Sequence, residues 1–335
     1  MTKYLRKISI RRLMKSLTQT TIMTSKSKFP LKKIWDVAGN STESLWWSAN
    51  KLSKKINDET IIFLMIPGNP GVISYYIPFL TTIYNKLEQR VEVIGVSNLG
   101  HSHGPHNTFD TLYSLQEQTD HKIQCFDDLR EKFSKDCVQP KFILCGHSIG
   151  AYMCSQVLKA RPNHGIINVY SLFPTLQHIQ KTPNGIMLNF LFGEHQRNLA
   201  SSFVQSLRCL LAPTIFKFIV KLCTFQSEPH LSVTTEQLLH GPIVKNTLYM
   251  ANTEMATVNE LDEDLYRQHL DKFIFYFGVK DNWAPLKHYN DMLTRFPDGN
   301  IYLCDQGMPH AFIFGYSEIM GNKVSSWIEK AIDEV

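Results

Sequence analysis

The first 35 residues of this 335-residue chain contain no aspartate or glutamate. They hold ten lysine or arginine residues, which leaves 25 basic and 30 acidic residues for the other 300 positions. The net charge of +5 therefore comes from this segment, and the rest of the chain is net acidic. A nucleic-acid-binding protein usually carries its basic patch on the folded part, so the charge pattern argues against a nucleic-acid partner. We predict that residues 1–35 form a basic, disordered extension.

Cysteine pairs with metal-binding or redox spacing are also missing. The seven cysteines are odd in number and include no C-x-x-C, which favours reduced thiols in a cytosol-facing protein. His101, His103 and His106 lie close together, but no carboxylate follows at a ligand-like spacing, so we interpret them as part of a polar loop. We expect no metal ion and no cofactor.

The N-terminal region lacks the continuous apolar run and small-residue cleavage site of a secretory signal, which argues against secretion. Its arginines and its lack of acids are also typical of a mitochondrial transit peptide, so mitochondrial targeting is an alternative prediction for the localisation.

Alternation of apolar runs and amphipathic stretches begins at Thr60 and predicts βαβ units on a parallel sheet. The run Ile61–Ile66 is apolar throughout, as expected of a strand that is buried on both faces. After Pro174 the pattern breaks until about residue 255 and then returns. We predict an α/β domain over residues 36–335, with a mostly parallel sheet, helices on both faces and an apolar cap inserted at about 175–255. Further strands are expected at 91–96, 141–145, 165–173, 273–277 and 300–304, and helices at 116–135, at 286–295 and up to about 332.

Ser148 lies in Gly146-His147-Ser148-Ile149-Gly150, which fits the G-x-S-x-G pattern of a nucleophilic serine. An apolar strand precedes the motif, and a segment without glycine or proline follows it, as a strand-to-helix turn requires. The same pattern recurs around Ser102, but Pro105 follows there and no helix can start. We therefore predict Ser148 as a nucleophile, against the simpler interpretation of a glycine-rich turn with an incidental serine.

A serine nucleophile needs a histidine base, and the base needs an acid that orients it. In this type of fold the chain order is serine, acid, histidine. Asp281 follows the predicted strand Phe273–Phe277, and His310 follows the last predicted strand. We predict these two as acid and base, although Asp281 could instead cap a helix. Weaker rivals are Asp262, Asp264 and Asp271 for the acid and His269 and His288 for the base.

Backbone N–H groups must also stabilise the negative charge that develops on the substrate oxygen. One should belong to Ile149, directly after the serine. The other should come from Pro67-Gly68-Asn69-Pro70-Gly71, where proline has no N–H, so Asn69 is the first choice and Gly71 the second. A turn rich in proline and glycine would have the same composition.

Taken together, these motifs resemble the lipid droplet-associated hydrolase family of α/β-hydrolases. The resemblance covers roughly residues 60–332 and rests on the motifs at 66–71, 146–150, 173–175 and 182–185, on Asp281-x-Trp283, on Leu303-Cys304 and on 309–312. It implies a triad of Ser148, Asp281 and His310. It also implies residence on lipid droplets and the endoplasmic reticulum, with a lipid ester, such as a sterol ester, as substrate.

The segment from Phe203 to Phe225 carries no acid, and its only charges are Arg208, Lys217 and Lys221. Such a segment is typical of an interfacial hairpin whose cations reach lipid head groups, with Phe216, Ile219 and Val220 entering the lipid. A buried pair of cap helices is the equally weighted alternative.

These observations predict a serine hydrolase that cleaves lipid carboxylic esters through an acyl-serine intermediate. The rival hypothesis is a lipid-droplet adaptor on a hydrolase scaffold with little turnover, because a fold does not guarantee an activity. The sequence does not indicate an oligomeric state.

Overall fold

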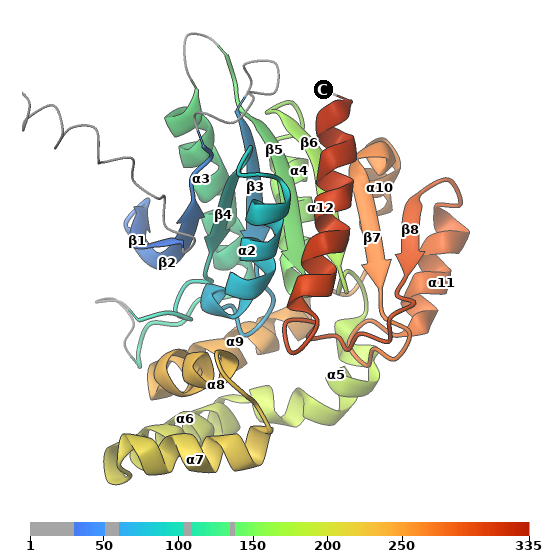
Figure 1. Cartoon of the computed structure of the whole chain (residues 1–335). Helices are drawn as coiled ribbons and strands as arrows, with labels where there is room; N and C mark the ends of the chain where they lie inside the picture. Colours follow the sequence, from blue (N-terminus) through green and yellow to red (C-terminus); the bar gives the residue numbers. More distant parts are fainter. Residues whose placement is uncertain (1–29, 51–59, 104–108, 135–137, 335) are drawn as a thin grey trace, which may run out of the picture. The chain divides into compact units, whose positions relative to one another are not determined.

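The computed structural model describes residues 30–50, 60–103, 109–134 and 138–334 (Figure 1). An eight-stranded sheet runs in the order β1-β2-β4-β3-β5-β6-β7-β8. The pairs β1–β2 and β2–β4 are antiparallel, and the five other pairs are parallel. The predicted mostly parallel sheet is therefore confirmed. Its strands are β1 (Leu31–Val37), β2 (Asn40–Trp47), β3 (Ile61–Ile66), β4 (Glu92–Val96), β5 (Lys141–His147), β6 (Ile166–Leu172), β7 (Phe273–Phe277) and β8 (Asn300–Leu303).

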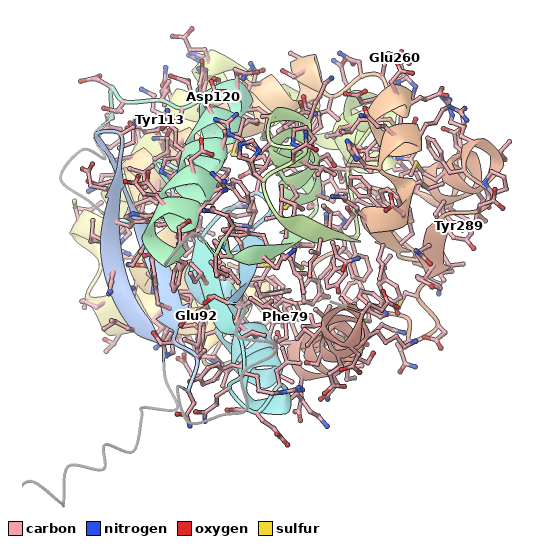
Figure 2. All side chains as sticks on the ribbon, turned by 90° about the horizontal axis from the view of Figure 1, so that it is seen from above. Phe79, Glu92, Tyr113, Asp120, Glu260 and Tyr289 are labelled. Atoms are coloured by element: carbon pink, nitrogen blue, oxygen red, sulfur yellow. The ribbon has the colours of Figure 1, made fainter. Side chains whose placement is uncertain are left out.

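Helices cover both faces of the sheet, as predicted. On one face α2 (Ile77–Lys86), which follows the short η1 (Ile73–Tyr76), packs against α12 (Ser317–Asp333). On the other face lie α3 (Leu115–Phe133), α4 (Ile149–Ala160) and α11 (Leu286–Arg295). In Figure 2, Asp120 on α3 and Phe79 on α2 mark the two sides. Alternate residues of β3 enter the two cores: Ile62, Leu64 and Ile66 face α3 and α4, and Ile61, Phe63 and Met65 face α2 and α12.

The sheet begins earlier than the sequence predicted. Strand β1 starts at Leu31, so the boundary at residue 36 is wrong, and the predicted extension before it falls on residues outside the described part. The β1–β2 hairpin was missed because β2 buries Thr42, Glu43 and Ser44 and so lacks an apolar alternation. A signal for it exists in Ala38-Gly39, where both residues have positive φ, as a two-residue hairpin turn requires.

The cap is inserted between β6 and β7, and Figure 1 shows α5 to α9 beyond one end of the sheet, whereas α10, which leads into β7, lies at the other end. The sequence showed no clear pattern here, but the structure is mostly helical. Its longest helices are α6 (Glu194–Leu210), α7 (Pro213–Thr224) and α9 (Gly241–Thr257). The shorter elements are η2 (Ile179–Lys181), α5 (Pro183–Leu188), η3 (Asn189–Phe192), α8 (His230–Val233), η4 (Thr234–Leu238), α10 (Glu263–Gln268) and η5 (Leu270–Lys272).

Helix α7 buries only one side. Phe216 and Val220 pack with Leu231 in a small core of their own. Leu207 and Leu211 are packed against this small core, but most of the other large apolar side chains of the α6–α7 pair are exposed, and Phe225 just beyond α7 is 89% exposed. No helix in the described ranges is both long enough and apolar enough to cross a bilayer.

Candidate active site

Ser148 occupies a sharp turn between β5 and α4. Its φ of 55° lies in the left-handed region, which non-glycine residues seldom adopt. The flanking glycines are required because backbone passes close on both sides. A Cβ on Gly146 would lie 2.4 Å from the backbone of Ala151, and one on Gly150 would lie 2.3 Å from the carbonyl oxygen of Ile66. The strand-turn-helix context expected of the motif is therefore present.

Three of the predicted residues meet at this turn. The Oγ of Ser148 lies 2.8 Å from Nε2 of His310, and Nδ1 of His310 lies 2.6 Å from Oδ2 of Asp281. Because an ionised carboxylate can only accept, Nδ1 carries the proton, and Nε2 is left to accept from the serine hydroxyl. The Asp281 side chain is fully buried and that of His310 is 17% exposed.

The ionisation of Asp281 is favoured by its surroundings. Burial acts to raise its pKa, but the hydrogen bond from His310 and those from the N–H groups of Ala284 and Trp283 outweigh burial and lower it. The rivals lie elsewhere: Asp262 caps α10 and pairs with Lys159, and His288 lies on α11.

The second match to the motif has a different environment. Ser102 is buried beside β2, where its Oγ accepts the N–H of Glu43 at 3.2 Å and lies 3.5 Å from Oγ1 of Thr42. Ser102 and His103 are not helical, and residues 104–108 lie outside the described part. His101 accepts the Gly71 N–H on Nδ1, and His103 stacks edge-on against His240, while His106 lies outside the described residues. Among the described residues, no three histidine, cysteine or acidic side chains are grouped so that they could hold a metal ion.

The loop after β3 lies against Ser148, since a Cβ on Gly68 would come within 3.0 Å of the serine Cβ. Two N–H groups of this loop are already used: Gly68 donates to the Tyr76 hydroxyl at 3.1 Å, and Gly71 donates to His101 at 2.8 Å. Within the described part of the chain, the N–H groups of Asn69 and Ile149 have no hydrogen-bond partner. The second choice, Gly71, is thereby eliminated as a donor.

Comparisons with known proteins identify the family of this chain. Residues 59–313 match the model of the family described as lipid-droplet associated hydrolase. The chain belongs to this family. A lipid droplet-associated hydrolase of Mus musculus is 32% identical over 80% of this chain and 84% of the relative, and one of Homo sapiens is 27% identical over 86% and 91%.

Solved structures support the α/β-hydrolase fold of this family member. A haloalkane dehalogenase from Agrobacterium tumefaciens superposes with a TM-score of 0.63 at 15% identity, covering 90% of this chain and 97% of the other. A thermophilic esterase from Thermogutta terrifontis gives 0.55 at 13% identity, covering 90% and 98%. At such low identity these likenesses show the fold alone, and the predicted fold class is confirmed.

His147 connects the parts of the candidate site, a role that the sequence did not indicate. The backbone carbonyl of His310 lies 2.8 Å from Nε2 of His147 and can only accept, so Nε2 carries the proton of the neutral ring. Nδ1 of His147 therefore accepts from the Tyr76 hydroxyl at 2.7 Å, and the oxygen of Tyr76 accepts the Gly68 N–H. Burial, and secondly the nearby His310, lower the pKa of His147 to about 3, which keeps it neutral.

The cap contacts the same loop through helix α9. The side-chain amide of Asn69 donates to the carbonyl of Thr247 at 3.0 Å and to Oε1 of Glu254 at 2.9 Å. Burial raises the pKa of Glu254 from 4.5 to about 8, although the hydrogen bond from Asn69 acts against this shift. At neutral pH Glu254 is therefore a neutral acid in the folded protein.

We predict that Glu254→Gln stabilises the protein at neutral and alkaline pH. The folded state keeps Glu254 protonated up to about pH 8, whereas the unfolded chain ionises it above 4.5. The wild type therefore loses stability as pH rises through this window, and glutamine does not. At about 1.4 kcal/mol per pKa unit, the gain at pH 8 is on the order of a few kcal/mol.

Urea unfolding from pH 4.5 to 8.5 measures this difference. The exposed acid Glu260, labelled in Figure 2, supplies the control Glu260→Gln, which should follow the wild type. Parallel curves for wild type and Glu254→Gln would show that Glu254 is ionised in the folded state.

Proposed function

We propose that this chain is a serine hydrolase that cleaves carboxylic esters of lipids through an acyl-Ser148 intermediate. The observation that carries the proposal is the hydrogen-bonded series from Ser148 through His310 to Asp281. A serine hydroxyl attacks an ester only when a base removes its proton, and this series supplies an oriented base.

In the proposed reaction, Nε2 of His310 takes the Ser148 proton while Oγ bonds to the ester carbonyl carbon. The carbonyl oxygen becomes an oxyanion, which the N–H groups of Asn69 and Ile149 and the N-terminus of α4 are placed to stabilise. His310 then protonates the departing alcohol as the carbon–oxygen bond breaks. A water molecule, deprotonated by the same nitrogen, hydrolyses the acyl-serine and restores the hydroxyl. The Asp281 carboxylate stabilises the transient imidazolium.

The hydrogen bonds through Tyr76 and His147 support this reaction indirectly. They connect the His310 backbone to the loop that carries Asn69. The base and the oxyanion donors are thereby held at fixed positions relative to Ser148. Neither side chain is placed to react with substrate, and both are positioning residues.

We further propose that the enzyme works on lipid esters at the surface of lipid droplets, with the cap against the lipid. Relatives named lipid droplet-associated hydrolase support the proposed localisation on lipid droplets. Residence on the cytosolic side of the endoplasmic reticulum, and sterol esters as substrates, are narrower forms of the same proposal. Large apolar side chains cluster on the cap, as expected of a surface that binds lipid. The exposed ones are Ile186, Met187, Phe190, Leu199, Phe203, Leu210, Ile215, Phe218, Ile219, Leu222 and Phe225.

Of the three side chains that the sequence predicted to enter lipid, only Ile219 is exposed. Phe216 and Val220 are each only 6% exposed and pack inside the cap, so they cannot enter lipid without unfolding it. The exposed set instead contains Phe218, Leu222 and Phe225, and it extends beyond residues 203–225 to α5 and η3.

We predict that Ser148→Ala abolishes labelling by a fluorophosphonate probe and lowers ester hydrolysis by several orders of magnitude. Ser102→Ala is the matched control, because Ser102 has the same local motif but is buried beside β2, and it should keep labelling and activity. Hydrolysis of a short, soluble ester separates chemistry from lipid binding. Labelling of the Ser148→Ala protein at the wild-type rate would refute the nucleophile, and absence of labelling in the wild type would favour the adaptor hypothesis.

We predict that Tyr76→Phe lowers kcat by about tenfold to a hundredfold with little change in KM, because loosened positioning slows the chemical step. Tyr76 is buried, so it does not contact substrate. Tyr84→Phe removes another tyrosine hydroxyl, from the following helix α2, which donates to the carbonyl of Ser48, and should leave both constants unchanged. Equal losses in the two variants would indicate a general effect on stability rather than positioning.

We predict that changing Phe218, Leu222 and Phe225 together to Gln releases the protein from droplets. Each side chain contributes about 1 kcal/mol or more when it enters lipid, so three lost together weaken binding by a hundredfold or more. The control variant changes Val279, Leu286 and Ile319 to Gln, which are exposed apolar residues outside the cap. Flotation with droplets measures both, after thermal melting has shown that they fold. Equal flotation would place the lipid contact elsewhere.

A further inference from the structure

A cavity of about 200 Å³ lies inside the cap, separate from the Ser148 site. It opens between the end of α6, the start of α7 and η4. Leu210 and Ile215, which are next to the lining residues Leu211 and Phe216 in the chain, are exposed and belong to the apolar surface proposed to meet lipid. Its lining residues are Arg208, Leu211, Pro213, Thr214, Phe216, Lys217, Thr235 and Glu236.

Arg208 brings an uncompensated positive charge to this cavity. Its guanidinium donates to the carbonyl of Thr235 and lies 5.4 Å from the ring centre of Phe216, but no carboxylate among the described residues pairs with it. Burial lowers the pKa of Arg208, as expected where no anion offsets the loss of water. The other cation, Lys217, is already neutralised by Glu228 at 2.7 Å and also donates to Ser232.

Glu236 brings a negative charge to the same cavity. Its backbone carbonyl accepts from the rings of His103 and His240, whereas its carboxylate, which belongs to an exposed residue at the mouth of the cavity, has no hydrogen-bond or ion-pair partner in the described ranges. Arg208 and Glu236 do not form an ion pair with each other, although both line the cavity. The first turn of α7 adds N–H groups that no side chain caps, and it contains no acidic residue of its own.

An unpaired cation and an unpaired anion in one cavity are complementary to a ligand that carries both charges. Arginine and helix N-termini bind phosphate well, and a carboxylate binds an ammonium group. A free phosphate or a fatty acid would satisfy Arg208 but would leave Glu236 facing a like charge. We propose that this cavity binds the zwitterionic head group of a phospholipid, with phosphate at Arg208 and the amine at Glu236.

This inference rests on the proposed contact of the cap with lipid, and it makes that contact specific. The acyl chains of the bound phospholipid would lie along Leu210 and Ile215. Binding would then fix the cap on a phospholipid-coated surface in one orientation, in addition to the non-directional contact of the apolar side chains.

Titration with monomeric dihexanoyl phosphatidylcholine, and with dihexanoyl phosphatidic acid as the analogue without an amine, tests the proposal. The full-length wild type should bind the phosphatidylcholine more tightly. Arg208→Gln should weaken binding of both probes about tenfold, because it removes a charge-assisted contact to phosphate. Glu236→Gln should weaken phosphatidylcholine binding about tenfold, but not the binding of phosphatidic acid.

Charge-matched controls lie outside the cavity. Lys221→Gln on α7 and Glu194→Gln on α6 change exposed charges of the same sign and should stay within about twofold of the wild type. Arg208→Lys keeps the cation and should retain most binding, and thermal melting identifies any variant that does not fold. Equal affinities for Arg208→Gln and Lys221→Gln, or equal effects of Glu236→Gln on both probes, would overturn the proposal.

The outcome is independent of the proposed chemistry. Arg208→Gln should keep wild-type fluorophosphonate labelling and hydrolysis of a soluble ester. If the wild type does not label at all, the proposed function fails while the titration still reports on the cavity.

Discussion

Two stretches of backbone approach each other at the carboxyl ends of β3 and β5 with no room for a side chain between them. The register of these parallel strands ends with Ile66 opposite Gly146, so the loop after β3 must pass the turn after β5. Gly150 contacts the carbonyl of Ile66, and Gly68 contacts Ser148. The serine oxygen and the free N–H groups of Asn69 and Ile149 take their relative positions from this approach. Any side chain at these glycines would separate the two loops and with them the elements of the site.

Burial shifts the pKa values of two titratable side chains next to this site. His147 and Glu254 are both neutral at pH 7, since the pKa of the first is lowered to about 3 and that of the second is raised to about 8. Asp281 is the exception, because three hydrogen bonds keep its pKa low. When His310 is protonated, the negative charge of Asp281 stabilises the imidazolium, and His147, being neutral, does not repel it. This arrangement favours the transfer that the proposed mechanism requires.

The sequence correctly predicted the elements whose local residue pattern reflects their position in the folded chain. Strands that are buried on both faces are continuous apolar runs, and the helix after Ser148 distinguished its motif from the one at Ser102. The β1–β2 hairpin was missed because hydrogen bonding, not apolar character, buries Thr42 and Glu43. Whether Asn69 or Gly71 keeps a free N–H depends on His101, thirty residues further along the chain than Gly71, which no local pattern indicates.

The cap shows most clearly why tertiary partners cannot be inferred from an apolar segment alone. Helix α7 is apolar around most of its circumference, so its sequence does not reveal that Leu231 covers Phe216 and Val220. The side chains that remain uncovered lie on the outer helices, whereas α9 packs against α6 and binds Asn69 through Glu254. The same insertion thus presents an apolar surface on one side and holds a loop of the candidate active site on the other. The proposed contact with a lipid surface and the proposed positioning of the oxyanion donors therefore depend on a single packed unit, and we expect substitutions that loosen α9 to affect both.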